Sequence, residues 1–154
     1  MALNFDIPGS EPLRLDHLVL DVNGTLTDRG NLIAGVEERV GRLRDALEVG
    51  LLSADTFGNL DGIAEALGLE AARISLGTEK RAYVERLGAG SCAAIGNGAN
   101  DEAMLKLARL GIAVVGREGA SATAVRAADL VCGSIVDALD LLLDQDALAS
   151  TLRP

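Results

Sequence analysis

The side chains of this chain that could do chemistry stand directly after short apolar runs. Asp21 and Ser53 each end such a run, and Asn97 and Asp101 lie in a glycine-rich segment that follows another. An aspartate carboxylate can attack phosphorus and form an aspartyl-phosphate. The phosphoryl oxygens then need hydrogen-bond donors and a cation around them, because they carry spread negative charge. Residues of these types in this order are therefore what phosphoryl transfer requires.

Positive charge is scarce in this sequence, so an anionic substrate must be met by a local cation. The formal net charge of the 154 residues is −9 at pH 7. Lys80, in the segment Thr-Glu-Lys near the start of a predicted helix, can supply an ammonium group. The carboxylates of Asp21 and Asp101, together with carbonyl and amide oxygens, can hold Mg²⁺, which prefers oxygen ligands. We expect Mg²⁺ as the cofactor, since it would also stop Asp21 from repelling phosphate.

Alternating strands and helices are predicted to position these residues. Apolar runs without polar alternation are typical of strands that helices cover on both faces. The predicted strands are residues 17–21, 49–53, 91–95, 112–115 and 129–132, and the predicted helices are residues 33–48, 59–67, 78–87, 101–110, 121–127 and 135–143. This order predicts parallel βαβ units in a three-layer α/β sandwich. Ligands bind such sheets at the carboxyl ends of the strands, where the polar residues stand.

The chain is expected to hold one domain after a short leader. Residues 1–16 contain prolines, a glycine and mixed charge, and they are predicted to form an irregular N-terminal leader. Residues 17–154 are predicted to form a single α/β domain, which is long enough to bury a core. The segments 27–34 and 55–78 are too short to hold a cap domain, so we expect an open site.

Composition and charge argue against several classes of partner. Aromatic residues make up 2% of the chain and tryptophan is absent, so a platform for stacking nucleic-acid bases is not expected. The net charge of −9 also repels nucleic acid and anionic membranes. No apolar run approaches the ~20 residues of a membrane span, and the N-terminus lacks the pattern of a signal peptide. Cys92 and Cys132 stand in apolar runs, so we expect buried, reduced thiols and a cytoplasmic protein.

Four segments in order resemble the signatures of the haloacid dehalogenase (HAD) superfamily. Asp21-Val-Asn-Gly-Thr-Leu-Thr is similar to the first signature, an Asp-x-Asp-Gly-Thr-type loop. Ser53 and Lys80 match the second and the third, and Gly96-Asn-Gly-Ala-Asn-Asp resembles the fourth, a Gly-Asp-Gly-x-Asn-Asp-type loop. The resemblance covers residues 17–143 in the order of the family, which is far more specific than one motif.

The resemblance is strongest to the phosphorylation domain of P-type cation ATPases and to soluble, capless P-type ATPase-like phosphatases. Ser53-Ala-Asp looks like their Thr-Gly-Asp, and residues 96–105, 111–115 and 127–129 resemble their hinge signature and the strand that follows it. The resemblance implies a Rossmann-like, mostly parallel sheet without a cap domain. It also implies a Mg²⁺-dependent phosphatase or phosphotransferase that acts on small phosphate esters through an aspartyl-phosphate intermediate.

The same resemblance implies a role for each site residue. The implied catalytic residues are Asp21, Asn23 and Lys80. The implied phosphate-binding residues are Ser53, Ala54, Gly24 and Asn100. The implied metal ligands are Asp21, Asn23, Asn97 and Asp101.

Two positions depart from the family pattern. Asn23 stands where the family has an aspartate that works as general acid and base, and an amide cannot exchange a proton near pH 7. Asn97 replaces a charged metal ligand with a neutral one. Slow turnover and weak Mg²⁺ binding are therefore expected, and the alternative is a degenerate, non-catalytic binding or regulatory module. Small capless relatives often cover their sites by oligomerising, so a homo-oligomer is a further expectation.

Several site residues also have a structural explanation that the sequence leaves open. Asn23-Gly24 is compatible with a hairpin turn, Ser53 with a helix cap, and Lys80 with a solvated helix position. Asp55 is equally compatible with a helix cap and with a place in the site. The segment 96–101 begins like a dinucleotide-binding fingerprint, but it lacks the third glycine and the acidic residue that should follow.

Overall fold

A six-stranded parallel sheet forms the centre of the computed structural model, which describes residues 2–154. Its strands are β3 (His17–Asp21), β6 (Glu48–Ser53), β7 (Glu70–Arg73), β8 (Cys92–Gly96), β9 (Leu110–Val114) and β10 (Leu130–Cys132). Their order across the sheet is β10-β9-β8-β3-β6-β7. The strand that ends in Asp21 therefore lies in the middle, between the strands that end in Gly96 and Ser53.

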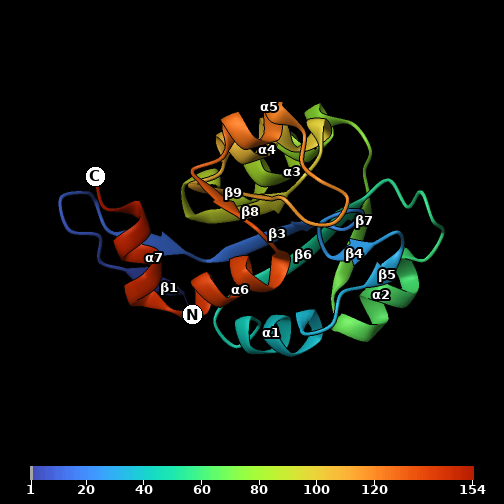
Figure 1. The fold of residues 1–154 in the computed structure, drawn as a ribbon, viewed down its shortest axis with the longest axis horizontal. Coiled ribbons are helices and arrows are strands. Elements are labelled where there is room, and N and C mark those ends of the chain that lie inside the picture. The colour runs from blue at the N-terminus through green and yellow to red at the C-terminus, as the bar shows by residue number, and fades with distance from the viewer. Residues whose placement is uncertain (1) are drawn as a thin grey trace.

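Helices cover both faces of this sheet (Figure 1). One face carries α1 (Val36–Leu43), α2 (Leu60–Leu67) and α6 (Ile135–Leu143), and the other carries α3 (Gly77–Leu87), α4 (Glu102–Leu107) and α5 (Ala122–Ala127). Short 3₁₀ turns precede β8 and α4, at Ala89–Ser91 and Ala99–Asp101. The predicted three-layer α/β sandwich is confirmed.

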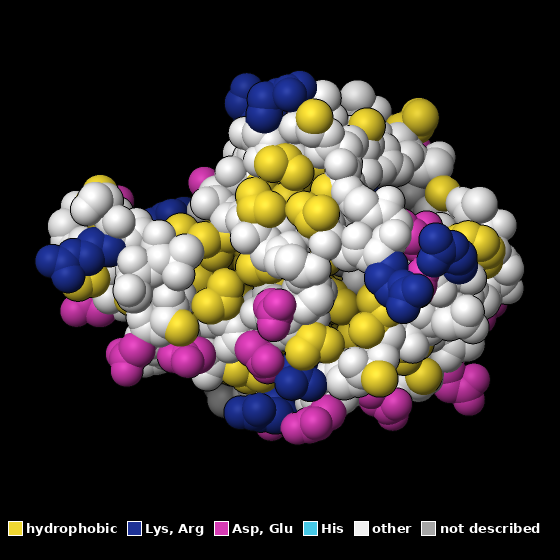
Figure 2. Space-filling model, viewed as in Figure 1, with side chains coloured by type: hydrophobic (Ala, Val, Ile, Leu, Met, Phe, Trp, Pro, Cys, Tyr) yellow, Lys and Arg dark blue, Asp and Glu magenta, His cyan; other side chains and the backbone are white. Residues whose placement is uncertain are grey.

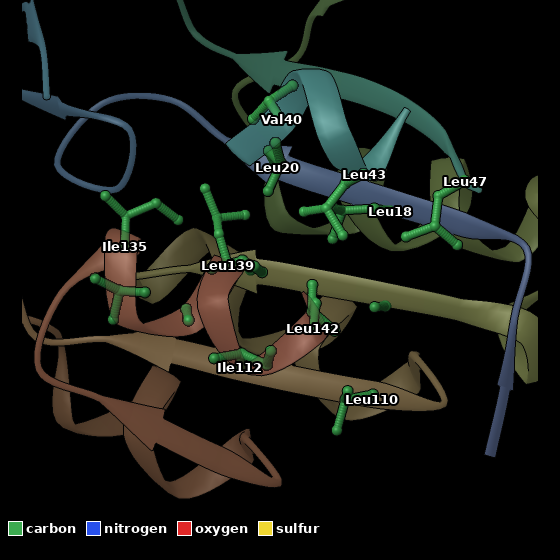
Figure 3. Close-up of a cluster of buried hydrophobic side chains, with 14 of the residues drawn as sticks. Leu18, Leu20, Val40, Leu43, Leu47, Leu110, Ile112, Ile135, Leu139 and Leu142 are labelled. Atoms are coloured by element: carbon green, nitrogen blue, oxygen red, sulfur yellow. The ribbon is translucent and has the colours of Figure 1, made fainter. Parts of the chain in front are cut away.

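The side chains of β3 alternate between two hydrophobic cores, as the period of a strand requires. Leu18 and Leu20 belong to the larger core, with α1 and α6, and Val19 belongs to the smaller core under α3, α4 and α5. Figure 3 shows Leu20 near Val40 of α1 and Leu139 of α6. All of these side chains are fully buried, so truncating Leu20 to alanine should cost about 2–5 kcal/mol. The centre of the sheet is thus a rigid support for the residues at the end of β3.

The N-terminal residues differ from the sequence prediction, because the expected irregular leader is wrong. β1 (Leu3–Phe5) and β2 (Leu13–Leu15) pair as an antiparallel hairpin, and α7 (Gln145–Leu152) packs against it. The apolar–polar–apolar order of β2 places Leu13 and Leu15 in the core, where Phe5 is also buried. Two prolines and a turn glycine masked this short alternation in the sequence.

Some predicted helices and strands also differ in their bounds from those in the structure. The helix predicted for residues 33–48 is α1, which begins at Val36 because Gly35 before it has φ +92°, a left-handed conformation that cannot continue a helix. The edge strand β7 was not predicted, since its sequence Glu-Ala-Ala-Arg lacks the β-branched residues that favour strands. Each difference arises at an edge or an end, where fewer contacts select the structure.

Between β3 and α1 the chain forms only a small hairpin, β4 (Thr27–Asp28) and β5 (Asn31–Leu32). The described residues contain no cap domain over the carboxyl ends of the strands. Among residues 2–154, no helix is long and apolar enough to cross a membrane. On the face in Figure 2, basic side chains are dispersed rather than gathered into a patch that would attract nucleic acid.

Candidate active site

The polar residues predicted from the sequence meet at the carboxyl edge of the sheet. Asp21 and Ser53 are the last residues of β3 and β6, which are neighbours, and Asn97 follows β8 on the other side of β3. Lys80 lies in the first turn of α3, and Asp101 lies in the 3₁₀ turn before α4. The ends of three adjacent strands and two helices therefore build one site.

A buried lysine joins two buried carboxylates at this edge. Lys80 Nζ lies 2.8 Å from Asp21 Oδ1 and 2.7 Å from Asp101 Oδ1. The exposed fractions are 1% for Lys80, 6% for Asp21 and 0% for Asp101. Removing one partner of such a buried group typically costs about 3–5 kcal/mol, because it leaves an uncompensated charge away from water. Lys80 is thus a fixed cation beside the proposed nucleophile and not a solvated helix residue.

Burial shifts the proton equilibria of this group. Burial raises the pKa of Asp21 to about 7, and the negative charge of Asp101 acts in the same direction, while Lys80 and Thr25 act in the opposite direction. Burial lowers the pKa of Lys80, but the two carboxylates raise it by more, so it lies above its usual value. Lys80 therefore stays charged near neutral pH, and Asp21 would need a further positive charge to be fully ionised.

Asp101 holds Lys80 and the loop after β8 in place through both of its carboxylate oxygens. Its Oδ1 accepts from Lys80, and its Oδ2 accepts from the backbone N–H groups of Asn97 (3.1 Å) and Gly98 (2.9 Å). A Cβ at Gly96 would lie 2.5 Å from the Asp101 carboxyl group, so only glycine fits there. Both oxygens of Asp101 are engaged by protein donors, which supports a role in holding Lys80 and the loop after β8.

Thr25 connects Asp21 with Asn97, and sequence reasoning did not single it out. Its Oγ1 lies 2.9 Å from Asp21 Oδ2 and 3.2 Å from Asn97 Oδ1. Asn97 Nδ2 in turn donates to the Gly119 carbonyl at 3.1 Å. A Cβ at Gly24, which has φ +78°, would come within 2.5 Å of Asn97 Nδ2. The fixed position of Thr25, four residues after Asp21 in the first motif, was the available signal.

Donors for an anion surround the end of Asp21. The carbonyl of Val22 accepts from three successive N–H groups, those of residues 25–27, and so closes a tight loop. Within residues 2–154 the backbone N–H groups of Asn23, Gly24 and Ala54 donate to no protein acceptor. Successive free N–H groups in a loop form an anion-binding concavity. Ser53 stands beside them and is only 2% exposed.

Two predicted residues contribute less to this cluster. Asn100 is exposed, and its Nδ2 donates to the Ser75 carbonyl at 2.9 Å, so it ties the loop after β8 to the segment before α3. Asn23 is half-buried, and its side chain makes no hydrogen bond with the described residues. The phosphate-binding role of Asn100 and the catalytic role of Asn23 stay predictions.

The oxygen atoms near Asp21 suit a hard divalent cation. Asp21 Oδ2, Thr25 Oγ1 and Asn97 Oδ1 converge, and the single hydroxyl proton of Thr25 cannot fully satisfy both of the other oxygens. Carboxylate and carbonyl oxygens are the ligands that Mg²⁺ prefers. No cluster of three His, Cys, Asp or Glu side chains occurs among the described residues, so such a site would hold little negative charge. The residues present fit weakly bound Mg²⁺.

Comparisons with known proteins bear on the fold of this chain. No family model matches the chain. An uncharacterized protein of Methanocaldococcus jannaschii is 53% identical over 60 residues, which cover 39% of this chain and 64% of that relative, less than two thirds of its length. Among solved structures, a protein of Streptomyces avermitilis assigned to the HAD family of hydrolases has a TM-score of 0.64 and 22% identity, covering 79% of this chain and 85% of the other.

Two further structures share the fold. The 3-deoxy-D-manno-octulosonate 8-phosphate phosphatase of Moraxella catarrhalis, solved with magnesium, phosphate and a KDO molecule, has a TM-score of 0.64 and 18% identity over 90% of this chain and 94% of its own. The catalytic domain of the CPx-ATPase CopB-B has a TM-score of 0.58 and 19% identity over 77% of this chain and 46% of its own. This protein therefore has the α/β fold of the haloacid dehalogenase hydrolases, with no cap domain in residues 2–154.

Proposed function

We propose that this protein is a Mg²⁺-dependent phosphatase or phosphotransferase of the HAD superfamily. In this proposal it acts on small phosphate esters through an aspartyl-phosphate on Asp21. The observation that carries the proposal is the buried Asp21–Lys80–Asp101 group at the centre of the sheet edge, with free backbone N–H groups beside it. A buried cation at the nucleophile is what an anionic substrate requires in a chain of net charge −9.

Each residue of the site would have a distinct role in binding the phosphoryl group or transferring it. The phosphoryl oxygens would be bound by the N–H groups of Asn23, Gly24 and Ala54, by the Ser53 hydroxyl and by Lys80 Nζ. Asp21 would attack phosphorus as the ester P–O bond breaks, and the electron pair would leave with the alcohol oxygen. Bound Mg²⁺, held by Asp21, Asn97 and the Asn23 carbonyl, would supply positive charge that lets Asp21 ionise and approach an anion. The magnesium and phosphate in the Moraxella phosphatase support this assignment.

Turnover is proposed to be slow because of Asn23. A general acid and base at this position would protonate the leaving group and later activate water, which is worth roughly 10²–10⁴-fold. The amide of Asn23 can do neither. Esters with good leaving groups should still phosphorylate Asp21, and the aspartyl-phosphate should then accumulate.

An activated aryl phosphate tests the proposal. With Mg²⁺ the wild type should release a rapid burst of phenol close to one equivalent per site and then turn over slowly, whereas Asp21→Asn should show neither phase. Beryllium fluoride with Mg²⁺ should raise the unfolding temperature of the wild type but not that of Asp21→Asn. A protein that gives no burst and no beryllium fluoride response would instead be the degenerate, non-catalytic module.

Two finer expectations accompany this proposal. Cys92 and Cys132 are buried and unpaired within the described residues, which supports a reducing, cytoplasmic location. The site lies open at the sheet edge, which leaves room for a second copy of the chain to cover it. Size-exclusion chromatography with light scattering would test the proposed homo-oligomer.

A further inference from the structure

The turn after β6 is held in a backbone conformation that few side chains adopt. Asp55, two residues after Ser53, has φ +57°, and among residues 2–154 only Arg29 shares this feature outside glycine. A left-handed backbone costs a non-glycine residue about 1–2 kcal/mol, and the cost is smaller for aspartate than for most because its side chain can bond locally. Such strain persists only where the surrounding contacts fix it.

Every polar group of Asp55 is engaged in this turn. Its N–H donates to Ser53 Oγ at 2.9 Å, and its carbonyl accepts from the Gly58 N–H at 3.1 Å. Its Oδ1 accepts from the N–H of Leu60, the first residue of α2, at 3.0 Å. Its Oδ2 lies 3.2 Å from Nε of Arg73, the last residue of β7 and the register partner of Ser53. The turn is therefore locked to the strand beside it.

The contact with Ser53 controls where its hydroxyl proton can point. The Asp55 N–H occupies one side of Ser53 Oγ as a donor, so the hydroxyl must donate in another direction. Ser53 is almost fully buried, and within the described residues its hydroxyl donates to no protein acceptor. A buried donor without an acceptor is costly and needs an explanation. A phosphoryl oxygen above Asp21 would provide the acceptor.

We propose that Asp55 is a positioning residue: its left-handed turn, clamped by Arg73, aims the Ser53 hydroxyl at a phosphoryl oxygen. The identity of this ligand rests on the function proposed above. A simpler role as the cap of α2 would use only the contact with the Leu60 N–H and would leave Ser53 unaffected. The two roles differ in one measurable respect, because only positioning makes the effect of Asp55 depend on Ser53.

A double-mutant cycle separates the roles, with inorganic phosphate in the presence of Mg²⁺ as the probe in calorimetry. Asp55→Ala removes the clamp and disfavours the left-handed turn, so phosphate affinity should fall about tenfold, or about 1.4 kcal/mol. In the Ser53→Ala background the same change should alter affinity less than twofold. Asp55→Asn isolates the clamp: asparagine tolerates the turn and keeps an acceptor for the Leu60 N–H, but its NH₂ group cannot accept from Arg73, so its loss of affinity should match that of Arg73→Met.

The unfolding temperature provides the readout of the capping role. Asp55→Ala should lower it in both the wild-type and the Ser53→Ala backgrounds, because the contact with the Leu60 N–H does not involve the hydroxyl. If Asp55→Ala proves too unstable, Arg73→Met tests the clamp alone and should show the same dependence on Ser53. Equal losses of phosphate affinity in both backgrounds would overturn this inference and leave the proposed function intact. A wild type that binds no phosphate and gives no burst would overturn both.

Discussion

The substitution Asn97→Asp tests how the site balances charge. It restores the carboxylate that the fourth HAD signature usually carries, and it hardly changes the side-chain volume. The new carboxylate would face two groups that repel a negative charge. One is the Gly119 carbonyl, which now accepts from Asn97 Nδ2 at 3.1 Å. The other is Asp21, which shares Thr25 Oγ1 with Asn97.

The structure sets the size of the effect. Because Thr25 Oγ1 lies 2.9 Å from Asp21 Oδ2 and 3.2 Å from Asn97 Oδ1, these two oxygens are no more than about 6 Å apart. Two negative charges at about 6 Å repel by about 3 kcal/mol at an effective dielectric constant of 20. Loss of the hydrogen bond to Gly119 adds about 1 kcal/mol. Without metal at pH 8, Asn97→Asp should therefore lower the free energy of unfolding by about 3–4 kcal/mol.

Two conditions should reverse this loss. Acid should restore stability, because protonating either carboxylate removes the repulsion. Mg²⁺ should restore it too, since the same pair of charges would attract the cation, and the Mg²⁺ dissociation constant should fall at least tenfold. Urea unfolding with chelator and with Mg²⁺ measures both effects, and Asn100→Asp is the control because it adds the same charge at an exposed position of the same loop. Equal stability of Asn97→Asp and wild type in chelator, with equal Mg²⁺ affinity, would refute the assignment of Asn97 to the metal position.

Three further outcomes follow from the same group of residues. Lys80→Met should cost about 3–5 kcal/mol at pH 8 and less in acid, because two buried carboxylates lose their shared cation; urea unfolding with an unchanged midpoint would contradict it. Without divalent metal, the raised pKa of Asp21, about 7, adds stability that is fully present below pH ~4 and is lost as the pH rises through 7. Asp21→Asn should flatten that slope in unfolding experiments, and an unchanged slope would place the titration elsewhere. Asn23→Asp should speed steady-state hydrolysis roughly 10²-fold or more after an unchanged burst, so equal steady-state rates would exclude Asn23 as the cause of slow turnover.

The sequence was sufficient to predict the layers of the fold because its strands are buried on both faces. Leu18 to Leu20 and Ala93 to Ile95 are apolar without interruption, as only strands between two helical layers need to be. The hairpin of residues 3–15 and the edge strand β7 could not be predicted in this way. They are short and covered on fewer sides, so their sequences carry little of the pattern that identifies a strand.

The sequence could place the site residues at one edge but could not give their partners. Lys80 has the spacing of an ordinary helix residue, and only the packing of α3 against the sheet turns its ammonium between Asp21 and Asp101. Asp101 was predicted as a metal ligand, yet its oxygens meet Lys80 and two backbone N–H groups. Such pairings depend on distances between loops that are far apart in the sequence, which residue types alone do not determine.

An asparagine rather than an aspartate at position 97 can be explained by the stability of the metal-free protein. When Asp21 is ionised, Asp21, Asp101 and Lys80 together carry one net negative charge in a region that is almost fully buried. A third carboxylate would raise that to two, and no second lysine or arginine makes an ion pair with Asp21 or Asp101 among the described residues to compensate it. The amide keeps an oxygen beside Thr25 for a cation, and its NH₂ group binds Gly119 without adding charge. An amide at position 97 therefore favours the stability of the metal-free fold, and it would weaken the binding of the proposed Mg²⁺.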